Sequence, residues 1–168
     1  MIVAVTGTPG TGKTTLAKLL AKRLGYGYVN INEFAVKHCL RGVDKKRKSR
    51  IIDIKRLARL SGKFKGNLVL DSHLSHFCRA RFKFVLRTNP IVLKRRLEKK
   101  GWGAKKVKEN VDSEILGIIA YEAKGIEIDT TGVGVAKTAL KMERVIKHKA
   151  SYSKKKIDWL PKYGNRLL

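Results

Sequence analysis

Short apolar runs recur along the chain, and stretches with helical periodicity separate them. The runs are rich in β-branched residues, and several end at glycine or a charged residue, which is typical of strands buried in a sheet. They predict five strands, at Ile2–Val5, Tyr28–Ile31, Leu68–Leu70, Phe82–Leu86 and Ile126–Ile128. Because strands that alternate with helices form βαβ units, we expect a parallel sheet with helices on both faces. Ligands bind at the carboxyl ends of such strands, where Gly7, Asp71 and Arg87 lie.

Apolar residues spaced three and four positions apart predict the helices between these strands. Gly25 ends the first helix, and Asn89-Pro90 opens another, since proline suits the first helical turn. One segment reads as a single long amphipathic helix over Val107–Ile119. The other apolar faces span Leu16–Leu24, Phe34–Leu40, Ile51–Leu60, Val92–Leu97 and Val135–Ile146.

A phosphate-binding loop joins the first strand to the first helix. Residues 7–14 read Gly-Thr-Pro-Gly-Thr-Gly-Lys-Thr and match the G-x-x-x-x-G-K-[ST] pattern. Glycines let backbone N–H groups turn toward phosphate oxygens, and the following helix adds its positive N-terminal end. An ordinary glycine turn would lack the buried strand before it and the leucine-faced helix after it. We expect Lys13 to contact the β- and γ-phosphates of ATP and Thr14 to ligate Mg²⁺, within a nucleotide site made of Gly10, Gly12, Lys13, Thr14 and Thr15.

A carboxylate and an imidazole follow the third strand. We expect Asp71 to hold Mg²⁺ through water, although a strand-terminal aspartate can also be a turn or cap residue. His73 is a catalytic candidate that would orient the attacking water or the acceptor phosphate, with a hydrogen-bonded structural histidine as the alternative. For His76 the structural role is favoured. The two histidines lack a third ligand nearby, so a metal site made from them is not expected.

The order of the elements narrows the class of P-loop protein. A GTPase would carry an Asn-Lys-x-Asp motif, which the chain lacks, and the Leu60-Ser61-Gly62 signature belongs to transporter ATPases much longer than 168 residues. Five strands, an insert after the second and a basic turn after the fourth are typical of a nucleoside monophosphate kinase. We therefore expect one α/β P-loop NTPase domain over residues 1–168. The insert, at about 32–62, would cover the acceptor, and a short lid, at about 99–108, would bring positive charge onto the transferring phosphate.

Three segments resemble the adenylate kinase isoenzyme 6 family. The first is the loop Gly7–Thr15 and the second is Asp71-x-His73. The third is longer and comprises Val85–Asn89, Leu93, Arg96–Glu98, Gly101-Trp102, Lys105–Val107, Glu109–Val111 and Glu114-Ile115. The resemblance covers residues 1 to about 147 and is weakest in the insert.

This resemblance implies transfer of the terminal phosphate of ATP to a nucleoside monophosphate, with AMP as the expected acceptor, together with ATPase activity. It also implies a role in late maturation of the small ribosomal subunit at the 3′ end of its rRNA, through transient binding of a platform ribosomal protein. The runner-up hypothesis is an ATP-switched RNA- or ribosome-assembly factor with incidental kinase activity. A kinase for a different small acceptor is a third.

Two regions depart from the family pattern, and one loop has two readings. Eukaryotic members carry an acidic stretch in the insert, whereas Asp44–Arg50 is basic here. The family's lid arginine aligns with Lys100, which keeps the charge but loses the bidentate fork. We expect Lys100 to be a catalytic and nucleotide-binding lid residue, although Glu98–Lys100 would also suit the end of a solvated helix. The loop Asp129–Gly132 lies either beside the nucleotide base or in an ordinary threonine-capped turn.

The composition adds a polyanionic partner to the picture. The net charge is +26, from 39 basic and 13 acidic residues, and basic residues cluster at Lys45–Arg50, Lys94–Lys100, Lys105–Lys108 and Lys147–Lys156. We expect contact with rRNA or a pre-ribosome through the insert and the basic tail at about 150–168. Tyr152 and Trp159 in the tail would stack on bases or dock onto the domain. A lineage-wide lysine bias is the alternative.

The remaining composition fits a cytoplasmic protein. Cys39 and Cys78 lack metal-ligand spacing and read as reduced thiols. No apolar run approaches the roughly 18 residues that a membrane helix needs, so we expect no membrane contact.

Overall fold

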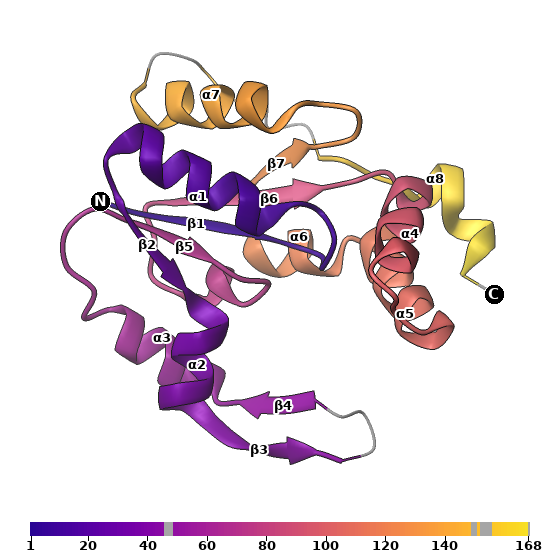
Figure 1. Ribbon diagram of the computed structural model, residues 1–168, viewed down its shortest axis with the longest axis horizontal. Coiled ribbons are helices and arrows are strands. Elements are labelled where there is room, and N and C mark those ends of the chain that lie inside the picture. The colour runs from indigo at the N-terminus through magenta and orange to yellow at the C-terminus, as the bar shows by residue number, and fades with distance from the viewer. Residues whose placement is uncertain (46–48, 149–150, 152–155, 168) are drawn as a thin grey trace.

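A five-stranded parallel sheet forms the centre of the protein (Figure 1). The structure is a computed structural model that describes residues 1–45, 49–148, 151 and 156–167. The strands are β1 (Ile2–Gly7), β2 (Gly27–Asn30), β5 (Leu68–Asp71), β6 (Phe82–Arg87) and β7 (Ile126–Asp129), in the order β2-β5-β1-β6-β7. All five strands and the α/β fold class are confirmed. The central β1 delivers the P-loop between β5 and β6, where the strand order reverses.

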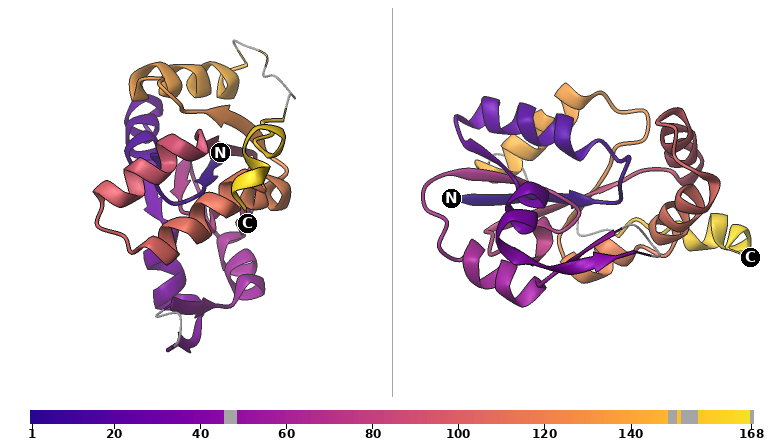
Figure 2. Two further views of the ribbon diagram at one scale, coloured as in Figure 1. Left: turned by 90° about the vertical axis from the view of Figure 1, so that its right-hand side faces the viewer. Right: turned by 60° about the horizontal axis from the view of Figure 1, so that its bottom comes forward.

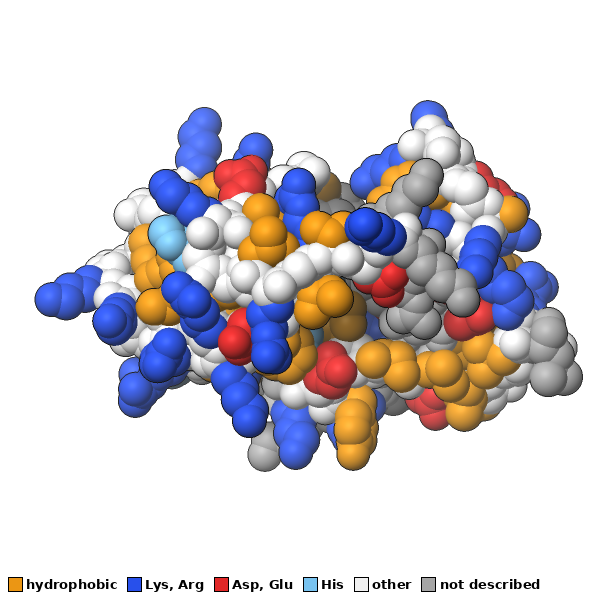
Figure 3. Space-filling view, turned by 90° about the horizontal axis from the view of Figure 1, so that it is seen from below, with side chains coloured by type: hydrophobic (Ala, Val, Ile, Leu, Met, Phe, Trp, Pro, Cys, Tyr) orange, Lys and Arg blue, Asp and Glu red, His pale blue; other side chains and the backbone are white. Residues whose placement is uncertain are grey.

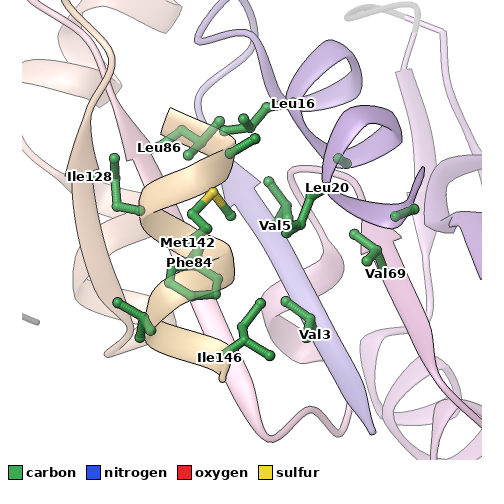
Figure 4. Packing of buried hydrophobic residues seen from close by; sticks show 14 residues of the cluster. Val3, Val5, Leu16, Leu20, Val69, Phe84, Leu86, Ile128, Met142 and Ile146 are labelled. Atoms are coloured by element: carbon green, nitrogen blue, oxygen red, sulfur yellow. The ribbon is translucent and has the colours of Figure 1, made fainter. Parts of the chain in front are cut away.

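Helices cover both faces of this sheet. α1 (Lys13–Leu24) and α7 (Val135–Ile146) lie together on one face, where Leu16, Leu20 and Met142 pack on Val3 and Val5 (Figure 4). The other face is covered in part by the 3₁₀ turn η1 (Ser75–Phe77) and by α6 (Ile118–Ala123). Alternate residues of β1 therefore enter different cores, as expected for a strand buried on both faces.

The insert after β2 holds a hairpin that the sequence did not predict. Its elements are α2 (Ile31–Cys39), β3 (Leu40–Asp44), β4 (Ser49–Ile52) and α3 (Ile54–Ser61), and the antiparallel hairpin β3–β4 projects away from the sheet (Figure 1). The expected helix over Ile51–Leu60 is wrong at its start, because Ile51 and Ile52 pair with β3 and the Asp53 carboxylate caps α3 through the Arg56 N–H. β2 also ends at Asn30, one residue before the end of the predicted second strand, because the Asn30 side chain caps α2.

The single long helix predicted over Val107–Ile119 is wrong and is replaced by two helices. These are α5 (Ala104–Ile115) and α6, which begins only at Ile118. α5 packs against α4 (Pro90–Lys99), which precedes it in the chain. Gly117 breaks the helical path because its φ is +64°, a left-handed conformation that costs little only for glycine. The chain ends in α8 (Leu160–Tyr163) and η2 (Gly164–Arg166), beside α4 and α5 (Figure 2).

Two further expectations concern cysteines and membranes. Cys39 and Cys78 are free and buried, and burial raises the pKa of the Cys78 thiol to about 11. Among the described residues, no helix has the length and apolar character that crossing a bilayer requires.

The break at Gly117 predicts the effect of adding a side chain there. Gly117→Ala should lower the free energy of unfolding by about 1 kcal/mol, because alanine is strained at positive φ. Gly134→Ala is the matched control, since Gly134 has φ −63° and open space around its Cβ direction. Urea unfolding measures both variants, and equal stabilities would contradict the assigned role of the break.

Candidate nucleotide site

The P-loop backbone is shaped by glycines at three positions. At Gly7, with φ +138°, an added Cβ would lie 2.4 Å from the carbonyl oxygen of Leu86. Gly10 and Gly12 also have positive φ, and a Cβ at Gly10 would lie within 3 Å of side-chain atoms of Leu93 and Leu97 on α4. Gly12 then begins α1 with no side-chain cap. The first-turn N–H groups of α1 are thus left to an anion in the loop.

The Lys13 side chain lies against the backbone of this loop and is largely desolvated. Its Nζ donates a hydrogen bond to the carbonyl oxygen of Thr8 at 3.1 Å. Burial lowers the pKa of Lys13 to about 8, with Asp71 acting against the shift and the nearby Lys100 adding to it. A bound phosphate would favour the charged ammonium, so binding of an anion and protonation of Lys13 support each other.

One carboxylate oxygen of Asp71 lacks a hydrogen-bond donor among the described residues. The residue is 4% exposed, and its Oδ2 accepts a hydrogen bond from the hydroxyl of Tyr28 at 2.8 Å. Its Oδ1 has no hydrogen-bond partner among the residues that the structure describes. A buried carboxylate oxygen that lacks a partner among the described residues, close to Lys13, fits a hydrated divalent cation, and Thr14, the predicted second ligand, lies in the first turn of α1.

The two histidines after Asp71 take different places. His76 is buried, with Nδ1 3.1 Å from the Thr6 hydroxyl and Nε2 3.2 Å from Oε2 of Glu122, which is the structural arrangement. His73 is exposed at the mouth of the site. Desolvation by the surrounding walls, then Lys13 and His76, lower the pKa of His73 to about 4. Solvent contact moderates this shift, but its direction leaves a neutral ring at pH 7.

A cavity of about 530 Å³ adjoins the P-loop, and Lys99 and Lys100 of the predicted lid line it. Its walls include Lys100 and Thr130, so the end of α4 and the loop 129–132 face one space with Gly10, Gly12 and Thr15. The threonine cap that the alternative reading expected is wrong, because Gly134 is the N-cap of α7 and makes no side-chain cap hydrogen bond. Thr130 lines the cavity, and the Asp129 carboxylate accepts from the Thr131 N–H in a local turn. The full lining is Gly10, Thr11, Gly12, Thr15, Leu16, Arg96, Lys99, Lys100, Thr130, Val133, Val135 and Thr138.

Comparison with known proteins shows the family. A family model described as "AAA domain" matches residues 3–117. The "Putative adenylate kinase" of Thermococcus kodakarensis is 40% identical over 175 residues, covering 99% of this chain and 97% of its own. The protein of the same name in Methanocaldococcus jannaschii is 40% identical over 173 residues, with the same two coverages. The chain belongs to this archaeal adenylate kinase-like family.

Solved structures of P-loop kinases share the fold of this family member. Shikimate kinase from Acinetobacter baumannii, in complex with shikimate, matches with a TM-score of 0.66 at 16% identity, covering 88% of this chain and 93% of the kinase. Deoxyadenosine kinase from M. mycoides matches with a TM-score of 0.56 at 13% identity, covering 89% and 100%. At these identities the likeness concerns the fold alone.

Arg87, the third strand end, does not face a ligand in this adenylate kinase-like chain. Its guanidinium is buried and makes ion pairs with Glu114 at 2.8 Å and with Glu127 at 2.7 Å. Two carboxylates and the carbonyl oxygens of Glu114 and Ile157 use its donors. Arg87 therefore holds the sheet edge together, while Gly7 begins the P-loop and Asp71 lies close to Lys13.

Sequence reasoning missed three contributors to the site. Tyr28 holds one oxygen of Asp71, Arg96 lines the cavity with Nη1 3.4 Å from the carbonyl oxygen of Gly10, and Glu114 accepts from the Thr8 hydroxyl. Arg96 had a usable signal, because it lies one helical turn before Lys100. Tyr28 and Glu114 reach the site only through the tertiary fold.

The Asp71 arrangement predicts a specific loss. Asp71→Asn should weaken Mg²⁺-dependent binding of ATP about tenfold or more and leave metal-free binding nearly unchanged, because the amide removes the charge opposite the cation. Titration calorimetry with and without Mg²⁺ measures both affinities. Tyr28→Phe is the control, since it keeps the charge of Asp71 and removes only its hydrogen bond. An equal loss with and without Mg²⁺ would contradict the metal role.

Proposed function

We propose that this protein is a nucleoside monophosphate kinase that transfers the terminal phosphate of ATP to a monophosphate, with AMP as the expected acceptor. The observation that carries the proposal is the desolvated Lys13 beside the unpartnered oxygen of Asp71, at the mouth of a P-loop. The names of the archaeal relatives and the kinase fold of the neighbours support the same reaction class.

The residues around the loop have separate roles in this reaction. Mg²⁺, when bound through Thr14 and a water on Asp71, would neutralise charge on the β- and γ-phosphates. Lys13 contacts the same phosphates, and Lys100 with Arg96 brings positive charge from α4. His73, with a neutral ring, accepts a hydrogen bond from the attacking water or positions the acceptor phosphate.

The insert at 32–62 is proposed to cover the acceptor. It is attached to the site through Asn32, whose Oδ1 accepts a hydrogen bond from the hydroxyl of Ser72 at 2.6 Å, next to Asp71. Exposed apolar side chains on the hairpin, Leu40, Val43 and Ile51, offer a surface for a base or a partner. Part of the basic stretch Lys45–Arg50 lies outside the described residues.

The proposal predicts which activity depends on Lys13. Lys13→Ala should reduce phosphoryl transfer about a thousandfold or more while leaving the unfolding free energy nearly unchanged, because the charge acts on phosphates. Lys22→Ala, an exposed lysine on the same helix, is the matched control. Product formation is measured with ATP alone and with ATP plus each monophosphate. Turnover that no monophosphate accelerates would contradict the kinase and leave an ATPase.

A role in late maturation of the small ribosomal subunit, with a platform ribosomal protein and rRNA as partners, forms the second candidate function. The net charge of +26 supports a polyanionic partner, and in Figure 3 Lys and Arg side chains are scattered over the face and outnumber the acidic groups, among white and apolar surface. Trp159 does not present its ring as a free stacking surface, because it is half-buried and its Nε1 bonds Glu114. Tyr152 lies outside the described residues.

The charge predicts salt-sensitive RNA binding. Reversal of Lys45 and Arg50 in the insert, or of Lys156 in the tail, should weaken binding of an rRNA fragment. Each phosphate that a variant no longer neutralises should reduce the slope of log affinity against log salt by about one. Turnover on small substrates should stay nearly unchanged. Lys22→Glu is the control for net charge alone. Equal effects of all reversals, or no binding at low salt, would assign the charge to composition.

A further inference from the structure

Glu114 collects hydrogen bonds from three separate parts of the chain. It lies near the C-terminal end of α5 and is 1% exposed. Its Oε2 accepts from the hydroxyl of Thr8 in the P-loop. Its Oε1 accepts from Arg87 Nε at 2.8 Å, the Thr88 N–H at 3.0 Å and Trp159 Nε1 at 3.3 Å. One buried carboxylate thus connects the P-loop, the end of β6 and the C-terminal segment.

The C-terminal segment makes further hydrogen bonds before and after Trp159 in the sequence. The Ile157 N–H donates to Oε2 of Glu127 at 3.1 Å, and its carbonyl oxygen accepts from Arg87 at 2.9 Å. Further along, the Tyr163 hydroxyl accepts from Nδ2 of Asn89 at 2.7 Å, next to the start of α4. In both figures α8 lies beside α4 and α5 (Figures 1 and 2). The indole of Trp159 is therefore held in place from two directions.

Thr8 connects Glu114 to the P-loop, because its hydroxyl donates to the Glu114 carboxylate. Its carbonyl oxygen accepts from Lys13 Nζ at 3.1 Å and from Thr11 Oγ1 at 2.9 Å. Fixing the side chain of Thr8 therefore also fixes the carbonyl group that holds Lys13. Hydrogen bonds to a carboxylate are the strong class, and burial strengthens them further.

We propose that Trp159, in the segment Ile157–Tyr163, supports the nucleotide site from outside it, because its N–H helps to orient Glu114 and Glu114 positions the P-loop through Thr8. The proposal rests on the proposed function only in taking ATP as the ligand. Glu114 and Trp159 act through Thr8, so they are positioning residues. Nucleotide binding and docking of the tail then favour each other, as linkage requires.

A double-mutant cycle on ATP affinity tests this route. Thr8→Val removes the hydroxyl at nearly constant volume and should weaken ATP binding about tenfold. Trp159→Phe removes the N–H donor and should weaken it by a smaller factor. The double variant should lose less than the product of the two, by about threefold or more, because both losses pass through Glu114. Tyr163→Phe is the tail control, and its effect should multiply with that of Thr8→Val without coupling.

Fluorescence provides a second readout that a purely structural role would not change. The chain has two tryptophans, so Trp102→Phe leaves Trp159 as the single emitter. ATP should then shift Trp159 emission, and Thr8→Val should remove that shift at saturating ATP. Glu114→Gln is less suitable, since it leaves Arg87 only one carboxylate and risks unfolding.

The outcomes separate this inference from the proposed function. Additive effects of Thr8→Val and Trp159→Phe, or Trp159 emission that ignores ATP, would overturn the positioning route while ATP binding stands. Equal coupling with Tyr163→Phe would also overturn it, because the tail would then act as a whole. Absence of ATP binding by the unaltered protein would instead overturn the proposed function.

Discussion

The register of β1 against its two neighbours is the constraint on which the nucleotide site depends. On one side Val5 pairs with Asp71, and on the other Gly7 pairs with Leu86. These pairings place Asp71 beside Val5, two residues before the P-loop begins, and bring Gly7 against the backbone of β6. Because a one-residue slip would turn every side chain to the opposite face, the buried apolar residues of β1 also fix the geometry of the phosphate site.

Charged groups at this edge of the sheet fall into two kinds. Arg87, Glu114 and Glu127 are buried and satisfy one another, so removing one leaves the others uncompensated, at a cost of about 3–5 kcal/mol. Lys13 and Asp71 are also desolvated, but one oxygen of Asp71 has no hydrogen-bond partner in the part of the chain that the structure describes. The Arg87 ion pairs stabilise this edge of the sheet, whereas Lys13 and Asp71 are the charged groups that we propose to contact a ligand. This contrast distinguishes the binding side of the edge from its structural side.

The sequence predicted the parts of the fold that depend on local pattern. The five strands, the P-loop and its flanking helix follow from apolar runs and glycine spacing, because those signals reflect burial directly. The hairpin β3–β4 was missed because Leu40, Val43 and Ile51 are exposed, so no buried face imposes a period of two on the sequence. The break at Gly117 was missed because the apolar positions on either side of it continue the helical period.

The site shows the same division. Lys13, Thr14 and Asp71 were predicted as site residues because a loop motif and a strand end mark them, and their roles stay predictions. Tyr28 lies 43 positions from Asp71, and Glu114 lies 106 positions from Thr8, so no local pattern marks either contact. A buried polar side chain is specified by what it satisfies, and that partner is known only once the sheet and the helices are packed.

Arg96 bears on Lys100, the predicted lid residue that stands where the resemblance implies an arginine. Lysine at position 100 carries charge without the planar fork that suits a phosphate. Arg96 lies one turn earlier on α4, so residues 96 and 100 share a helix face and line the same cavity beside the P-loop. α4 and its C-cap Lys100 thus supply both a guanidinium and an ammonium to that cavity. Since Gly10 packs against Leu93 and Leu97 of the same helix, any movement of α4 that brings these charges toward a nucleotide must also repack the P-loop. The lid and the loop are therefore expected to adjust together.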